Sequence, residues 1–150
     1  MEFDKTTQDA LKLIHEGNHI IFREVGRVCE KYHLNYFLDS GNLIGAVREK
    51  SDIPWDDDAD IAMTRKDFEV FRKVARTELK DGFVYVEPDE LNGAFYDFVP
   101  RVVMLDSTMR ENNAEQKYYG NGIHNHMRTD IFIVDDVSDN MLSTNFVMLY

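Results

Sequence analysis

The order of hydrophobic periodicities along the chain predicts an α+β domain whose sheet is mixed or antiparallel. In the first half, apolar residues recur at the three- and four-residue spacing of helices, with one strand embedded between helical segments. From residue 83 onward the period changes to two, as in strands, and the intervening loops are rich in Asn, Gly and Asp. Helices first and strands later are typical of this fold class.

Three helices are expected in the first half of the chain. Apolar residues at helical spacing over 11–32 predict a long first helix. The short apolar run 35–38 ends at Asp39, Ser40 and Gly41, and Leu43, Ile44 and Val47 then predict a short second helix. Thr64 with Asp67 three residues later forms a capping-box pattern, which predicts that a third helix begins there.

Four strands are expected besides the run 35–38. Pro54 cannot continue a helix, and residues 58–63 then alternate acidic or small residues with apolar ones, as a strand does. Segments 83–86, 94–105 and 127–134 also have the period of strands. The apolar segment 140–150 is expected to be helical. Either this helix docks on the domain as its last element, or the whole chain is the front part of a longer protein.

Length, charge and cysteine content limit the possible functions. The 150 residues are expected to form one domain, 1–150, and the net charge of −11 repels a polyanion, so nucleic acid is an unexpected partner. The one cysteine, Cys29, lies among helical apolar positions and is expected to be a core residue. No secretory signal or transmembrane pattern is visible, which predicts a cytoplasmic protein.

A run of acidic residues is the strongest sign of a functional site. Asp56, Asp57, Asp58 and Asp60 lie within five positions, and strand alternation would put Asp56, Asp58 and Asp60 on one side. Carboxylates that close together oppose folding unless a cation or basic side chains neutralise them. Mg²⁺ or Mn²⁺ is the expected ion, because Mg²⁺ binds oxygen ligands and usually shares them with substrate phosphates. The alternative is a solvated acidic turn, since charge runs are usually exposed.

Two neighbouring features favour the metal site. Ser40 and Gly41 precede a helix whose N-terminal amides could hold a phosphate. Asp130 interrupts the apolar strand 127–134, where an acidic residue must be paired, hydrogen-bonded or metal-bound. A glycine turn, an aspartate pair and a third aspartate are what metal-dependent transfer at a nucleotide phosphate requires.

These motifs resemble the signature of the LicD and fukutin-related transferases. The stretch Asp39-Ser-Gly-Asn-Leu-Ile-Gly-Ala-Val-Arg48, followed by Ile53-Pro-Trp-Asp-Asp-Asp-Ala-Asp60, is similar to the family's Gly-Gly-Thr-Leu-Leu-Gly-Ala-Val-Arg and Ile-Pro-Trp-Asp-Asp-Asp-Ile-Asp. The likeness extends through 65–71 and 129–134. Ser40 and Asn42 replace the usual Gly and Thr, and Ile133 replaces a usual Pro.

The resemblance implies a nucleotidyltransferase-type fold and a phosphotransferase that moves phosphocholine, or another phospho-alcohol, from a CDP-linked donor to a glycan hydroxyl. The expected acceptor is a teichoic acid, a lipopolysaccharide or another surface polysaccharide precursor. By position, the resemblance assigns the catalytic metal pair to Asp58 and Asp60 and the third carboxylate to Asp130. It also favours Arg48 as a donor-phosphate ligand, with Lys50 as a weaker candidate.

Other residues are assigned more modest roles. Trp55 is expected to pack in the core, although its ring could also face a base or a choline-like cation. Arg101 is expected on the solvent face of its strand rather than at the donor phosphates. His15 and His19 have zinc-site spacing without a third ligand and are expected to be a partly exposed pair. The roles of His124 and His126, near Asp130, stay open.

Three functions remain distinct at this stage. The first is the phospho-alcohol transferase. The second is a nucleotidyltransferase that places a nucleoside monophosphate on a hydroxyl and releases pyrophosphate. The third is a catalytically silent binding module of the same fold, against which the three retained carboxylates argue.

Overall fold

A computed structural model describes residues 5–91, 99–107 and 126–136. Its helices are α1 (Lys5–Tyr32), α2 (Ser40–Ile44) and α3 (Arg65–Glu78), with a π-helical turn at Gly45–Glu49 after α2 and a 3₁₀ turn at Pro88–Leu91. Its strands are β1 (Phe37–Leu38), β2 (Asp60–Thr64), β3 (Phe83–Val86), β4 (Arg101–Met104) and β5 (Met127–Val134).

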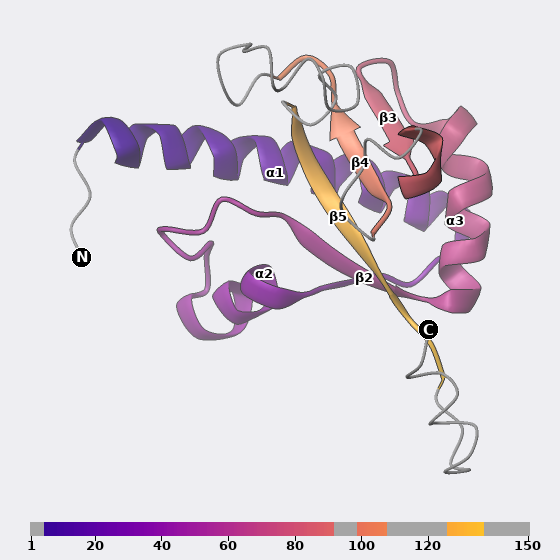
Figure 1. The fold of residues 1–150 in the computed structure, drawn as a ribbon. Helices are drawn as coiled ribbons and strands as arrows, with labels where there is room; N and C mark the ends of the chain where they lie inside the picture. Colours follow the sequence, from indigo (N-terminus) through magenta and orange to yellow (C-terminus); the bar gives the residue numbers. More distant parts are fainter. Residues whose placement is uncertain (1–4, 92–98, 108–125, 137–150) are drawn as a thin grey trace.

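The strands form one mixed sheet, as the sequence predicted. Its order is β1-β2-β5-β4-β3, so β5 lies at the centre although it is the last of the described strands in sequence. The β2–β5 pair is parallel, and the other three pairs are antiparallel (Figure 1). The sheet therefore places the segment around residue 60 directly beside the segment around residue 130.

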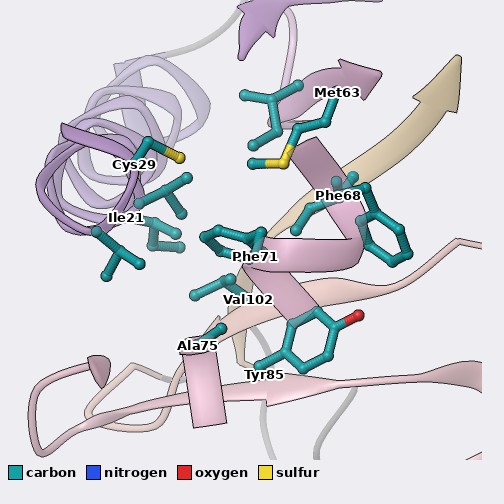
Figure 2. Packing of buried hydrophobic residues seen from close by; sticks show 12 residues of the cluster. Ile21, Cys29, Met63, Phe68, Phe71, Ala75, Tyr85 and Val102 are labelled. Carbon is teal, nitrogen blue, oxygen red and sulfur yellow. The ribbon is translucent and has the colours of Figure 1, made fainter. Parts of the chain in front are cut away.

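The hydrophobic core lies between the sheet and helices α1 and α3. Apolar residues of α1 recur every three or four positions, and those on its buried side, such as Ile21 and Val28, reach Phe71 and Ala75 of α3. Met63 of β2, Tyr85 of β3 and Val102 of β4 belong to the same cluster (Figure 2). Ile61 of β2 and Ile131 of β5 complete it. Among the described helices, none is both long enough and apolar enough to span a membrane.

Most of the predicted elements are confirmed. Strands 83–86 and 127–134 have the predicted bounds. Helix α3 has Thr64 as its N-cap, whose side-chain oxygen accepts a hydrogen bond from the Asp67 amide at 3.3 Å. The predicted strand 94–105 is observed as Arg101–Met104, and residues 94–98 lie outside the described parts, as does the predicted helix 140–150.

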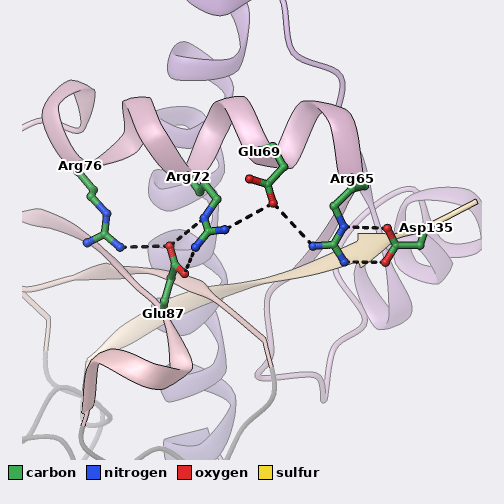
Figure 3. A network of polar contacts seen from close by, with 6 residues as sticks. All are labelled: Arg65, Glu69, Arg72, Arg76, Glu87 and Asp135. Carbon is green, nitrogen blue, oxygen red and sulfur yellow. Dashed lines mark hydrogen bonds and ion pairs between the residues drawn. The ribbon is translucent and has the colours of Figure 1, made fainter. Parts of the chain in front are cut away.

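The solvent side of α3 carries a network of ion pairs (Figure 3). Arg65 binds Asp135 just after β5, while Arg72 and Arg76 both bind Glu87 just after β3. Arg72 makes two contacts with Glu87, at 2.6 Å through Nη2 and at 3.2 Å through Nε. The Arg65–Asp135 pair is exposed and contributes little stability, whereas Glu87 is largely buried beneath Arg72 and Arg76. The network links α3 to neighbouring strand ends.

Candidate functional site

Two aspartates lie side by side at the centre of the sheet. Asp60 begins β2, and its register partner in the parallel β2–β5 pair is Asp130. Register partners point to the same face of a sheet, and side chains alternate along each strand. Their neighbours Ile61 and Ile131 are in the core beneath the helices. Asp60 and Asp130 therefore lie on the opposite face, away from α1 and α3.

Asp60 lies in an environment that disfavours its ionised form. Burial is the largest cause that raises the pKa of Asp60, to about 6, and the negative charges of Asp130, Asp58 and Asp56 raise it further. A hydrogen bond from Ser40 acts in the other direction. Four carboxyl groups thus share one small region, and the charge that they carry at neutral pH requires compensation.

Arg101 supplies part of that compensation. It lies opposite Asp130 in the antiparallel β4–β5 pair and is 1% exposed. Its Nε lies 2.9 Å from Asp130 Oδ1, and its Nη2 donates to Asp130 Oδ2 at 3.1 Å. The prediction that Arg101 faces solvent was wrong, because the strand on which it lies is covered on both faces.

The acidic segment before β2 is a loop. The strand begins only at Asp60, so the predicted strand alternation does not extend to Asp56 and Asp58. Each of these three offers a carboxylate oxygen, and these oxygens lie within 4.8 Å of one another. Asp58 thus lies with Asp56 and Asp57, while Asp60 lies with Asp130. Negative charge from both groups acts on the Asp60 carboxyl.

Helix α1 holds this loop in place. The Asn18 side chain, 3% exposed, donates to the backbone carbonyl of Asp58 at 3.1 Å. One turn earlier, His15 Nε2 lies 2.7 Å from the backbone carbonyl of Asp56. His19 contacts the Asp52 carboxylate at 3.0 Å. Side chains from one face of α1 therefore replace the strand ladder that the acidic segment lacks, which explains why the strand begins later than predicted.

Ser40 to Asn42 form the first turn of α2 itself, after the N-cap Asp39, whereas Ser40 and Gly41 were predicted to precede the helix. This turn touches the acidic residues directly. Ser40 has a left-handed backbone, with φ of +47°, a region that glycine occupies more readily. The Asn42 side chain accepts a hydrogen bond from the Asp60 amide at 2.6 Å. A Cβ built on Gly41 would lie 1.9 Å from Asp56 Oδ2. The turn is thus fitted against the carboxylates, and its role in phosphate binding stays a prediction.

Gly41→Ala is expected to displace the Asp56 carboxylate, because its methyl group needs the space that Oδ2 occupies. The clashing oxygen is the far end of a half-buried side chain that can rotate aside, so the free energy of unfolding is expected to fall by roughly 0.5–1.5 kcal/mol. Chemical denaturation should show this loss, and adding Asp56→Ala should restore most of it by removing the clashing oxygen. A double variant as unstable as Gly41→Ala alone would contradict the close contact.

The predicted donor-phosphate residues Arg48 and Lys50 lie at the end of the π-helical turn. Both are exposed, and Arg48 Nε donates to the neighbouring Glu49 at 2.6 Å. Their role toward a donor stays a prediction. Trp55 is 60% exposed, so the prediction of core packing was wrong. It lies in the Pro54 turn, which carries its ring away from the core.

Among the described residues, the cysteine and the histidines that the sequence singled out make contacts that serve the fold. Burial raises the pKa of the Cys29 thiol to about 12, which confirms a core residue and excludes a ready nucleophile. His126 Nδ1 contacts the backbone carbonyl of Ser107, so this ring joins β5 to the end of β4. His124 lies outside the described residues. His19 is half-exposed and His15 less so, and both approach Asp52.

Sequence reasoning missed Arg101, Asn18 and His15 as part of this region. A signal for Arg101 was present, because a lone arginine and a lone aspartate in two apolar strands are complementary and both require partners. No comparable signal exists for Asn18 and His15. Their contacts join residues 40 and 41 positions apart, and periodicity gives no information at that separation.

Comparison with known proteins gives consistent results. The sequence profile of the LicD/FKTN/FKRP nucleotidyltransferase domain matches residues 33–149. The lipopolysaccharide cholinephosphotransferase LicD of Haemophilus influenzae is 50% identical over 44 residues, which are 29% of this chain and 17% of that protein. Uncharacterised proteins of Rickettsia typhi and Rickettsia prowazekii are 33% and 36% identical over 54 and 47 residues, or 36% and 31% of this chain. The matched segments cover 17% to 18% of the length of these relatives.

Proposed function

Because the chain belongs to the LicD/FKTN/FKRP nucleotidyltransferase family, we propose that it transfers a phospho-alcohol group, such as phosphocholine, from a CDP-linked donor to a glycan hydroxyl. The proposed acceptor is a lipopolysaccharide or another surface polysaccharide precursor. The relative from Haemophilus influenzae, described as a lipopolysaccharide cholinephosphotransferase, supports both choices.

One structural observation carries the proposal. Asp60 and Asp130, which are 70 positions apart in sequence, become register partners in the central parallel strand pair. Asp58 lies two residues before Asp60, at the end of the acidic loop. Carboxylates from two neighbouring strands and from the loop before one of them, next to a glycine turn, would supply the ligands that metal-dependent transfer to or from phosphate requires.

The residues present fit a divalent cation of the Mg²⁺ or Mn²⁺ type. All the candidate ligands are carboxylate oxygens, which these ions prefer. Arg101 and Arg128 both approach Asp130, at 2.9 Å and 3.9 Å, but two positive charges do not neutralise the carboxylates of Asp58, Asp60 and Asp130 when all three are ionised, and a divalent ion would supply the remaining positive charge. The raised pKa of Asp60 points to the same unmet need for positive charge.

Each residue has a defined role in the proposed reaction. A bound divalent ion would supply Lewis-acid stabilisation of the charge that develops on the transferred phosphoryl group. Asp58, Asp60 and Asp130 would hold the ion, and Ser40, Gly41 and Arg48 would position the donor phosphates. Both Asp130 oxygens contact Arg101, which favours a role as ligand over a role as general base.

The acceptor hydroxyl would attack the β-phosphorus of the CDP-linked donor, the bond from that phosphorus to the bridging oxygen would break, and the hydroxyl proton would be lost to solvent water. The leaving group is then CMP. A nucleotidyltransferase with the same residues would instead attack the α-phosphorus of a nucleoside triphosphate and release pyrophosphate. The two reactions use the same metal site and differ in their products.

Product analysis distinguishes these reactions. Protein incubated with Mg²⁺, CDP-choline and lipopolysaccharide acceptors is expected to release CMP in step with modified glycan, and EDTA should stop the release. Chromatography of the nucleotides measures the first product, and mass spectrometry of the glycan measures the second. Pyrophosphate from a triphosphate, without CMP from any CDP-donor, would replace the proposal with nucleotidyl transfer. Absence of both products with every donor would favour a binding module.

A further inference from the structure

We infer that Arg101 is a positioning residue for Asp130. Its guanidinium orients the Asp130 carboxylate so that this group can join Asp60 at a divalent cation, and its charge compensates Asp130 when no cation is bound. The part that concerns the cation rests on the proposed function, whereas the Arg101–Asp130 pair itself does not.

The contact geometry supports an orienting role. Arg101 reaches both oxygens of one carboxylate, with Nε 2.9 Å from Oδ1 and Nη2 3.1 Å from Oδ2. Two contacts from a rigid planar fork restrict rotation of the carboxylate, which a single contact from a flexible ammonium would not do. Each carboxylate oxygen has two lone pairs, so Asp130 keeps the capacity to bind an ion while Arg101 holds it.

The sheet register places the three charged groups in one row. Asp60 of β2 is opposite Asp130 of β5, and Asp130 is opposite Arg101 of β4. All three side chains therefore lie on the sheet face away from α1 and α3. Asp130 has a carboxylate on one side and a guanidinium on the other. The arginine attracts the carboxylate that Asp60 repels.

Stability alone is a weak explanation for this pair. A buried ion pair often contributes no more to stability than well-packed apolar residues of similar volume. The guanidinium is 1% exposed and therefore fully desolvated. What distinguishes the position of the pair is its adjacency to Asp60. Partners that orient metal-binding groups in this way usually change metal affinity 10-fold to 100-fold when they are replaced.

The Arg72–Glu87 pair provides a matched control. It also joins one arginine to one largely buried carboxylate through two contacts, but it links α3 to the residue after β3 and involves none of the acidic residues around Asp60 (Figure 3). Arg72 is 38% exposed. Arg72→Met therefore removes the same side chain and a similar pair of contacts without touching the acidic site.

The first measurement tests the pair in metal-free buffer. Asp130→Asn is expected to lower Tm by roughly 10 °C, because it leaves the buried Arg101 charge without this partner. Arg101→Met is expected to lower Tm by less, because the Asp130 carboxylate is 22% exposed and keeps Arg128 at 3.9 Å. The double variant should lose clearly less than the sum of the two single losses. Additive losses would show that the two side chains do not act together and would overturn the inference.

The second measurement tests positioning through the affinity for Mn²⁺, which isothermal titration calorimetry measures. Arg101→Met is expected to bind Mn²⁺ at least about tenfold more weakly than the wild type, and Arg72→Met within about twofold of it. Arg101→Lys keeps the charge but loses the fork, so an intermediate affinity is expected, and this variant also serves if Arg101→Met does not fold. Unchanged or tighter Mn²⁺ binding by a folded Arg101 variant would overturn positioning. A wild type that binds no Mn²⁺ would instead overturn the proposed metal-dependent function, while the metal-free cycle still tests the pair.

Discussion

Asp58→Asn and Asp60→Asn are each expected to lower the turnover of CDP-donor by about a hundredfold or more, because each removes a proposed ligand of the ion that stabilises transition-state charge. Asparagine has nearly the same size and shape, so the fold should be retained. The rate of CMP release at saturating donor and acceptor measures the effect.

Asp57→Asn is the matched control for these variants. Asp57 is an exposed member of the same acidic loop but is outside the proposed ligand set. Its replacement removes one unit of the same local charge, and turnover is expected to stay within a few-fold of the wild type. Equal losses from Asp57→Asn and Asp58→Asn would show that the ligand assignment is wrong, or that only the total charge matters.

Asp60→Asn is also expected to stabilise the metal-free protein at neutral pH. The folded protein raises the pKa of Asp60 from 3.8 to about 6, so it binds the proton more tightly than the unfolded chain does. Stability must therefore fall as the pH rises from about 4 to about 6, and the loss is at most about 3 kcal/mol above that range. Asparagine does not ionise and escapes this loss.

Denaturation of both proteins in EDTA, at several pH values, measures this difference. The variant should be more stable by roughly 1–3 kcal/mol at pH 7.5, and the advantage should disappear near pH 4. Millimolar Mg²⁺ should stabilise the wild type more than the variant, since binding to the folded state alone adds stability by mass action. A wild type as stable as Asp60→Asn in EDTA at pH 7.5 would contradict an uncompensated charge at this position.

The sequence was sufficient to predict the elements whose pattern is local. Strand 127–134 could be bounded because apolar alternation continues through Asp130, and α3 could be placed because Thr64 and Asp67 cap it within four residues. The mixed α+β class followed from the same local signals. The strand order could not be predicted in this way, because the parallel pairing of β2 with β5 joins segments that are separated in sequence by α3, β3 and β4.

The acidic residues of the candidate site could be predicted from the sequence, but the residues that hold them in place could not. The acidic run 56–60 and Asp130 are visible because charge in a repeated or apolar context stands out in one sequence, whereas the choice of Asp58 and Asp60 over Asp56 rests on the family resemblance. Arg101 required knowledge that β4 pairs with β5 in the register that puts it opposite Asp130. The loop conformation of Asp56 to Asp58 depends on hydrogen bonds from α1, which residue periodicity near residue 56 does not reveal.

The contacts of α1 with the acidic loop show that the part of the chain needed to form the candidate site includes this helix. The family profile begins at residue 33, after the last residue of α1, Tyr32. Yet α1 contributes one wall of the core and the Asn18 donor that fixes the backbone of Asp58. A shortened chain cut at the profile boundary would lack both, although it would keep every residue of the recognisable motif. Boundaries drawn from sequence likeness are thus narrower than the physical unit that presents the carboxylates, and recombinant fragments of this chain should retain residues 5–32.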